Sequence, residues 1–391
     1  MSPLRIVLLS SAYPSAAQPV NGIFVQDQAE CLATRHHVTV LVPASRTEAP
    51  GRLQETRHQD VTCWHLPRAF AQSAAHSLHH GPVRALQTPL LRHALMCRAA
   101  YARGLAQYIR RHGKPHLLHA HNLYPSGWAA AWLGRAFGVK VAVTEHSSVF
   151  AQQMQQPLQQ QLAQQALKDI HALLAVSPAM AETITRNLPQ TAPRVLPNVI
   201  RTAQFVPAAV QPHPRLRFFC LCLHTPGKGL QYLIEAARLL LAQGQDGFEL
   251  IIGGDGAYRG ELEQLAKPLG AQCRFVGLLS RGQAVAHMQQ CDVFVLPSLG
   301  ETFGIVLGEA MACGKPVLTT RCGGPEYIVE EKTGLLLPPA DAPALAAAMA
   351  NLLQGRGDFD AVHIRATVCQ RFGEAAFLQR SEALYNELIA E

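Results

Sequence analysis

One stretch, VFVLPSLGETFGIVLGEAMACGKPVL at residues 293–318, constrains the fold more than any other part of the chain. It opens with a short apolar run, 293–296, which is typical of a buried strand. A loop with proline and glycine follows, and from 303 to 313 the apolar residues recur at helical spacing. Gly314 and Pro316 then end the helix before another apolar run. The pattern predicts a strand–loop–helix–strand unit of a parallel α/β sheet.

The start of this helix has the properties of an anion site. The helix is predicted to begin near Thr302, so its first amide groups are those around Phe303, Gly304 and Ile305. Such amides have no partner inside the helix, and the positive end of the helix dipole lies beside them. A phosphate group is the ligand that a helix start of this kind favours.

Two carboxylates belong to this region: Glu301 directly precedes the predicted N-terminus of the helix, and Glu309 lies eight residues later, within it. If all eight residues were helical, the two would lie about 12 Å apart. The acid/base pair of a glycosidase needs roughly 5–9.5 Å, so the spacing argues against such a pair. We expect the two carboxylates to act separately along one extended ligand. The alternative is an ordinary βαβ unit with two surface carboxylates.

The chain predicts two α/β domains in tandem. Alternating strands and helices fill the first 200 residues, and a second alternating set follows the proline-rich boundary at 198–215. We expect two doubly wound, Rossmann-like domains facing across a cleft, with ligands at the carboxyl ends of the strands. The expected domains are residues 1–200, residues 201–372 and a C-terminal amphipathic helix at 373–391. The first strand–helix loop lacks GxGxxG, so the dinucleotide fingerprint is absent.

Charge is distributed unevenly between the two halves. Residues 1–200 carry 18 lysines and arginines against 8 acidic residues, whereas residues 201–391 carry 16 against 19. A strongly basic half predicts an anionic partner: a phospholipid surface, a lipid-diphosphate acceptor or nucleic acid. Because no aromatic-rich nucleic-acid motif accompanies the charge, we favour lipid and expect no nucleic-acid partner.

Residues 65–116 concentrate that charge, because they contain eight arginines and lysines and no acidic residue. Leucines interleave with the charges over 86–95. The segment is either a long solvated helix with its lead-in or an amphipathic basic patch that contacts anionic lipid or receives an anionic acceptor. The eight basic residues are Arg68, Arg84, Arg92, Arg98, Arg103, Arg110, Arg111 and Lys114.

The ten cysteines are scattered along the chain and form no CxxC motif. Several of them lie inside apolar segments. This distribution is typical of buried thiols in a reducing compartment. No apolar run approaches the roughly 18 residues of a membrane span, and the N-terminus enters a strand pattern rather than a signal peptide. We expect a cytoplasmic protein that contacts the inner face of the membrane peripherally. Despite 18 histidines, no metal site is expected.

Further polar residues stand at the ends of predicted strands. Lys228 lies between two glycines at a helix start, where a cation opposes the helix dipole and calls for a nearby negative group. His119 and His121 end one strand and share a face by alternation, and His146 ends the next. Alternatively, Lys228 is an ordinary exposed surface lysine. In the same way, His146 could be a loop histidine whose hydrogen bonds are satisfied.

The motif at 301–316 resembles the signature of the family 4 retaining glycosyltransferases, the group 1 glycosyl transferases with the GT-B fold. Their mark is two glutamates separated by seven residues, with Phe-Gly after the first and Glu-Ala-Met-Ala-x-Gly-x-Pro from the second. The resemblance runs from residue 4 to the end of the chain, although it is weak over 45–115. The matching residues are Glu301, Phe303, Gly304, Glu309, Ala310, Met311, Ala312, Gly314 and Pro316.

This resemblance implies a role for each candidate residue. Glu309 would hold the donor ribose and Glu301 the donor sugar, and the amides over 302–305 would hold the diphosphate. Lys228 would contact the donor phosphates and His146 the donor sugar. The glycine of the first loop, Gly22, would approach the diphosphate or the acceptor, although a plain turn is the alternative there. The catalytic residues would then be Glu301, His146 and Lys228.

The resemblance implies a retaining hexosyltransferase that moves a sugar from a UDP- or GDP-sugar to an acceptor hydroxyl, without a further cofactor. The acceptor would be a glycan or lipid-linked glycan of lipopolysaccharide or exopolysaccharide synthesis. Many family members carry an arginine five or six residues before the lysine, where this chain has Leu223 and Cys222. A second possibility is therefore a non-catalytic or regulatory binding protein with the same fold. A GT-B epimerase or phosphorylase is a third, but the signature and the chain length disfavour it.

Overall fold

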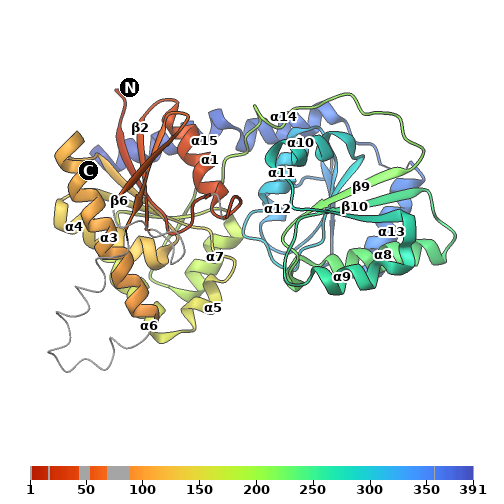
Figure 1. Cartoon of the computed structure of the whole chain (residues 1–391), viewed down its shortest axis with the longest axis horizontal. Coiled ribbons are helices and arrows are strands. Elements are labelled where there is room, and N and C mark those ends of the chain that lie inside the picture. The colour runs from red at the N-terminus through yellow and green to blue at the C-terminus, as the bar shows by residue number, and fades with distance from the viewer. Residues whose placement is uncertain (1, 16–17, 44–52, 68–88, 356, 391) are drawn as a thin grey trace. The chain divides into compact units, whose positions relative to one another are not determined.

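The structure is a computed structural model that describes residues 2–15, 18–43, 53–67, 89–355 and 357–390. It divides into two compact units (Figure 1). The first unit contains Met1–Val199 together with Phe377–Glu391, and the second contains Ile200–Ala376. The chain therefore passes from one unit to the other twice. The predicted basic residues Arg68 and Arg84 lie outside the described residues.

The first unit is built on a sheet of eight strands in the order β3-β4-β2-β1-β5-β6-β7-β8. Every neighbouring pair is parallel except β3 and β4, which form an antiparallel hairpin that the sequence analysis did not predict. The strands are β1 (Arg5–Leu9), β2 (His37–Pro43), β3 (Gln54–His58), β4 (Val61–Leu66), β5 (Leu117–His121), β6 (Lys140–Glu145), β7 (Ala172–Ala175) and β8 (Arg194–Val195).

Helices pack against this sheet, and one of them, α3, comes from the basic segment. One face of this helix is buried, since Cys97, Tyr101, Leu105 and Tyr108 pack into the unit, and the two alternatives stated for the basic segment remain predictions. The helices are α1 (Ile23–Ala33), α3 (Pro89–His112), α4 (Trp128–Phe137), α5 (Phe150–Met154), α6 (Pro157–Ala166), α7 (Pro178–Asn187) and α15 (Glu374–Ala390), and a π-helical turn (Leu123–Gly127) precedes α4.

The second unit has a fully parallel sheet of six strands in the order β11-β10-β9-β12-β13-β14. Its strands are β9 (Leu216–Leu221), β10 (Phe248–Gly253), β11 (Cys273–Gly277), β12 (Val293–Leu296), β13 (Val317–Thr320) and β14 (Gly334–Leu337). Its helices are α8 (Leu230–Ala242), α9 (Arg259–Ala266), α10 (Arg281–Gln290), α11 (Ile305–Ala312), α12 (Pro325–Ile328), α13 (Ala342–Leu353) and α14 (Ala361–Phe372).

Each unit has its own apolar core. In the second, Phe218 and Phe248 on the strands pack with Leu233 of α8 and Met349 of α13. In the first, strand residues such as Leu8 and Val40 pack with α15, whose Phe377 and Tyr385 are fully buried. Continuous apolar strands of this kind are typical of parallel sheets covered on both faces.

The strand order reverses near the middle of each sheet. In the first sheet β1 lies between β2 and β5, and in the second β9 lies between β10 and β12. Loops leave the carboxyl ends of the two central strands in opposite directions at such a point, which opens a crevice for ligands. The loops after β9 and β12 contain Lys228 and Glu301, so the fold gathers predicted site residues at this point.

No helix in the described part of the chain is both long and apolar enough to cross a membrane.

Candidate active site

The loops after β9 and β12 meet through a charged pair. The Nζ of Lys228 donates to Oε1 of Glu301 at 2.6 Å, and the same oxygen accepts the hydroxyl of Ser298 at 2.7 Å. The sequence predicted a negative group beside Lys228, and in the structure that group is the Glu301 carboxylate. The Lys228 side chain is 27% exposed and that of Glu301 12%, so the pair is partly shielded but reachable.

Close backbone packing fixes the positions of these two loops relative to each other. Gly229 has φ +70°, and a Cβ placed there would lie 1.9 Å from the carbonyl oxygen of Pro297. The amide of Leu299 donates to the carbonyl of Gly227 at 2.9 Å. Only glycine allows the turn after Lys228 to approach the β12 loop this closely. The Lys228–Glu301 contact therefore depends on the glycine that follows the lysine.

The helix after Glu301 begins three residues later than the sequence predicted. Gly304 adopts φ 100° as the N-cap, and α11 starts at Ile305, so Thr302 and Phe303 lie in the preceding loop. The reason is tertiary: Glu301 pairs with the segment at Gly323, and the amide of Gly324 donates to its carbonyl at 2.7 Å. The free amides of the helix start therefore begin at Ile305.

Phe303 contributes its side chain to the core rather than to an open site. The ring is 1% exposed and packs edge-on against Phe372, with centroids 5.4 Å apart, and against Tyr327 at 6.5 Å. A Cβ on Gly324 would come within 2.4 Å of the Phe303 backbone. This packing fixes the loop from which α11 starts, so only the backbone of Phe303 is available for its predicted role.

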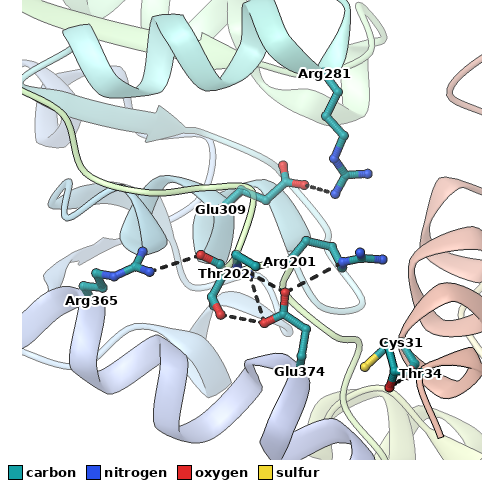
Figure 2. A network of polar contacts seen from close by, with 9 residues as sticks. Cys31, Thr34, Arg201, Thr202, Arg281, Glu309, Arg365 and Glu374 are labelled. Atoms are coloured by element: carbon teal, nitrogen blue, oxygen red, sulfur yellow. Dashed lines mark hydrogen bonds and ion pairs between the residues drawn. The ribbon is translucent and has the colours of Figure 1, made fainter. Parts of the chain in front are cut away.

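Glu309 lies one turn further along α11 and has a cationic partner of its own. Figure 2 shows Arg281 pointing toward Glu309, with Nη2 3.4 Å from Oε1. The Arg281 guanidinium also lies over the ring of Phe205, 5.3 Å from its centroid. The two predicted carboxylates therefore have separate partners, Lys228 for Glu301 and Arg281 for Glu309, and their separate roles along a ligand remain a prediction.

Sequence reasoning missed Arg281. It is the first residue of α10, directly after the N-cap Ser280, whose hydroxyl and Gln283 form a capping box. A Ser-x-x-Gln pattern after a predicted strand indicates a helix start, and the residue that directly follows the serine then lies at the carboxyl edge of the sheet. Leu223, which occupies a position where many family members carry arginine, is 54% exposed. Arg281 thus brings to this region a cation that the motif comparison did not identify.

A second polar network anchors the segment through which the chain enters this unit. The Glu374 carboxylate accepts the hydroxyl and amide of Thr202 at 2.6 and 3.2 Å, and Arg201 lies 3.8 Å away (Figure 2). Arg365 donates to the carbonyls of Thr202 and Phe205. The Arg281 guanidinium lies over the ring of Phe205 and also pairs with Glu309. By fixing Phe205, this network therefore helps to position the partner of Glu309.

In the first unit, Gly22 has a structural reason to be glycine. Its φ is +72°, and a Cβ would lie 2.3 Å from the carbonyl oxygen of Ala12 in the loop after β1. It is also the N-cap of α1. The plain-turn alternative therefore accounts for the residue type, and its predicted contact with the diphosphate or acceptor remains a prediction.

His146 belongs to a buried cluster of three histidines at the ends of β5 and β6. Its Nε2 lies 3.0 Å from Nδ1 of His121, and Phe24 packs on its ring with centroids 4.4 Å apart. His119 stacks on His121 at 4.9 Å, so the predicted shared face of these two is confirmed. The Nε2 of His121 is buried and has no hydrogen-bond partner among the described residues. The side chains of His119 and His121 are 0% and 1% exposed, so neither presents an open surface to a ligand.

Burial keeps these imidazoles neutral. It lowers the pKa of His119 to about 4 and that of His146 to about 3. His119 is held by hydrogen bonds of 2.7 Å to the hydroxyls of Tyr385 and Thr144. Burial also raises the pKa of the adjacent Glu145 to about 7, although the amides of Leu123, His146 and Ser147 donate to its carboxylate.

We expect the three buried histidines to destabilise the first unit as the pH falls, and Glu145, whose raised pKa acts in the opposite direction, offsets only part of that loss. Unfolded histidines take up protons near pH 6.5, whereas folded His119 does so only near pH 4, so the unfolded state is favoured progressively below about 6.5. One such group contributes a slope of about 1.4 kcal/mol per pH unit between these values. His119→Gln, which keeps hydrogen-bonding groups, should flatten the fall in Tm between about pH 7.5 and 5. Identical pH profiles for parent and variant would contradict the assignment.

Within the described residues, no cluster of three or more histidine, cysteine, aspartate or glutamate side chains is arranged to hold a metal ion.

With this geometry established, known proteins provide a comparison. The family model described as "Glycosyl transferase 4-like domain" matches residues 22–199, and the model "Glycosyl transferases group 1" matches residues 214–355. Between them they cover both units. The chain belongs to the group 1 glycosyltransferase family.

Curated relatives match over part of their length. The amylovoran biosynthesis glycosyltransferase of Erwinia amylovora is 36% identical over 184 residues, which are 44% of this chain and 45% of that protein. The phosphatidyl-myo-inositol mannosyltransferase of Mycolicibacterium smegmatis is 34% identical over 166 residues, 41% of this chain and 42% of that protein. The chain thus spans less than half of the length of these two relatives.

Solved structures share the fold over nearly the whole chain. Sucrose-phosphate synthase from Thermosynechococcus elongatus has a TM-score of 0.78 at 23% identity and covers 99% of both chains. The Anabaena protein HepE, solved in complex with UDP, has a TM-score of 0.71 at 20% identity and covers 98% of this chain and all of its own. These likenesses show two Rossmann-like domains of the GT-B type, which confirms the predicted fold class.

Proposed function

We propose that the protein is a nucleotide-sugar-dependent hexosyltransferase that transfers a sugar to an acceptor hydroxyl with retention of the anomeric configuration. The observation that supports this most lies at the carboxyl ends of β9 and β12, where the strand order reverses: Lys228 contacts Glu301 in the loop that leads into α11. A cation held at the loop that leads into a helix start, together with the free amides of that start, would suit a diphosphate, the leaving group of such a donor.

Each charged group has a separate part in this reaction. The α11 amides from Ile305 and the Lys228 ammonium stabilise the negative charge that develops on the departing diphosphate. Glu309 holds the ribose hydroxyls, and Glu301 contacts the donor sugar. The departing phosphate takes the proton of the acceptor hydroxyl on the same face of the sugar. The donor is a UDP- or GDP-sugar, and no additional cofactor or dedicated metal is required for these steps.

The acceptor is proposed to be a glycan or a lipid-linked glycan. The excess of basic residues over 1–200 favours an anionic acceptor or membrane surface for the first unit. Two relatives are consistent with this class, since one is named for amylovoran biosynthesis and another carries phosphatidyl-myo-inositol in its name. A cytoplasmic location with peripheral contact to the inner membrane face belongs to the same proposal.

The proposal is tested with a panel of nucleotide sugars. Calorimetric binding and release of free nucleoside diphosphate are recorded for the parent and for Glu309→Gln. We expect one donor to bind and turn over slowly without acceptor. Glu309→Gln should weaken its binding about ten- to hundredfold, because hydrogen bonds to a charged partner are worth roughly 1.5–3 kcal/mol.

Glu330→Gln provides the matched control, because Glu330 also pairs with an arginine, Arg371, in the same unit. It should bind donor like the parent. If Glu309→Gln bound and turned over the donor as well as the parent does, the ribose assignment would be wrong. Nuclear magnetic resonance of the product's anomeric proton decides between retention and inversion.

A second candidate is a binding or regulatory protein of the same fold without turnover. It is favoured by Leu223, a hydrophobic residue that is 54% exposed where many family members supply an arginine. The same panel separates the two functions. A donor that binds tightly and releases no diphosphate even with lipid-linked glycan acceptors would support the binding protein.

A further inference from the structure

A pocket of about 410 Å³ lies among three helices of the first unit, and none of the residues proposed to bind the donor lines it. It is bordered by α3, α4 and α6 and by the residues that follow α6. Two of the chain's three tryptophans, Trp128 and Trp132, line it, and small side chains at Ala131 and Ala166 leave the space open. Trp128 is held in place by its Nε1, which donates to Gln165 at 3.3 Å.

Arg98 of α3 enters this pocket between the two indoles. Its guanidinium carbon lies 4.7 Å from the ring centre of Trp128 and 5.1 Å from that of Trp132. These contacts use the faces of the guanidinium, so the in-plane N–H groups remain available as donors. Among the described residues, no carboxylate and no hydrogen-bond acceptor pairs with the Arg98 side chain. Burial also lowers its pKa, which reflects a desolvated cation without a compensating anion.

The remaining charges of the pocket add to this imbalance. Arg135 and Lys168 line it together with a single carboxylate, Asp169. That carboxylate is engaged by Arg135 at 3.3 Å, so it does not neutralise Arg98. Three cations therefore face one paired anion around a space of ligand size. Lys168 is exposed and lines this space.

We propose that this pocket binds a phosphate ester. The N–H edge of Arg98 would donate to two phosphate oxygens in the forked geometry that guanidinium groups form with phosphates, and Lys168 would add a point charge. The partly exposed ring of Trp132 would cover the apolar part of the ligand, as aromatic rings do where one end is apolar and the other wet. The phosphate belongs either to a soluble ester or to the headgroup of an anionic lipid. The proposal does not depend on the transfer reaction.

Intrinsic tryptophan fluorescence provides a direct readout, since two of three tryptophans line the pocket and the third, Trp64, is 1% exposed in β4. The probes are glycerol 3-phosphate and vesicles of phosphatidylcholine with or without phosphatidylglycerol. We expect a saturable fluorescence change. Arg98→Gln and Lys168→Gln should each weaken it about tenfold or more, as expected for loss of a charged hydrogen-bond partner.

Arg186→Gln is the matched control, because Arg186 is an exposed arginine of α7 in the same unit and does not line the pocket. It removes the same charge and should leave the titration unchanged. A response to glycerol 3-phosphate that depends on Arg98 supports a soluble ester. A response only to phosphatidylglycerol vesicles, again dependent on Arg98, supports a lipid headgroup. If neither probe gives a saturable change, or if all three variants titrate alike, the proposal is overturned.

Discussion

Replacement of Lys228 by methionine is expected to lower kcat/KM for the nucleotide-sugar donor about 10²- to 10³-fold, the usual cost of removing one preorganised donor from a developing negative charge. Two effects act in the same direction. The diphosphate loses its cation, and the Glu301 carboxylate, 2.6 Å from Nζ in the parent, keeps the Ser298 hydroxyl as its one side-chain partner among the described residues. An unneutralised carboxylate then repels the incoming diphosphate. Steady-state release of nucleoside diphosphate measures the loss.

Lys332→Met is the matched control, because Lys332 is an exposed lysine of the same unit, and it should retain parental kcat/KM. The double variant Lys228→Met/Glu301→Gln separates the two effects. If repulsion by Glu301 causes much of the loss, the double variant will be more active than the single variant toward donor hydrolysis. Parental activity in Lys228→Met would remove the lysine from the mechanism altogether.

Replacement of Gly229 by alanine is expected to destabilise the second unit by about 2–5 kcal/mol. A positive φ costs a non-glycine residue about 1–2 kcal/mol, and overpacking adds about 1–3 kcal/mol. The added Cβ would lie 1.9 Å from the Pro297 carbonyl oxygen, so backbone rather than a side-chain tip must move. The turn would also carry Lys228 away from Glu301, so donor binding should fall along with Tm.

The same loop offers an unusually close control. Gly227 is two residues away, its φ is not in the left-handed region, and a Cβ there would have no atom within 4 Å. Gly227→Ala should therefore keep both the Tm and the donor affinity of the parent. Thermal unfolding followed by circular dichroism and donor calorimetry make the comparison. Equal effects of the two substitutions would show that loop composition, rather than the approach to Pro297, sets the stability.

The sequence predicted those parts of the fold in which local pattern and burial agree. The strand at 293–296 was predicted with its observed bounds, because four apolar residues between turn signals are buried on both faces. The start of α11 was predicted three residues too early. Glu301 and Thr302 suit a helix start, but pairing of Glu301 with Gly323 holds them outside it. That pairing brings together residues 22 positions apart, and no local rule contains it.

Two further features lay beyond sequence reasoning for different reasons. The β3 strand, QETRH, is exposed throughout, so it shows no apolar alternation that could reveal a strand. The role of Arg281 beside Glu309 depends on where α10 begins relative to α11, which is a question of packing. By contrast, Lys228 and Glu301 were both singled out from their motifs, and the structure brings them into direct contact.

The C-terminal helix has a consequence for the order in which the protein can form. Phe377 and Tyr385 of α15 complete the apolar core of the first unit, and the Tyr385 hydroxyl hydrogen-bonds buried His119 at 2.7 Å. During synthesis these residues emerge only after the entire second unit has left the ribosome. The unit made first is therefore the one that finishes last, and until then its histidine cluster lacks its tyrosine partner. The second unit, contiguous from Ile200 to Ala376, can close its core without waiting.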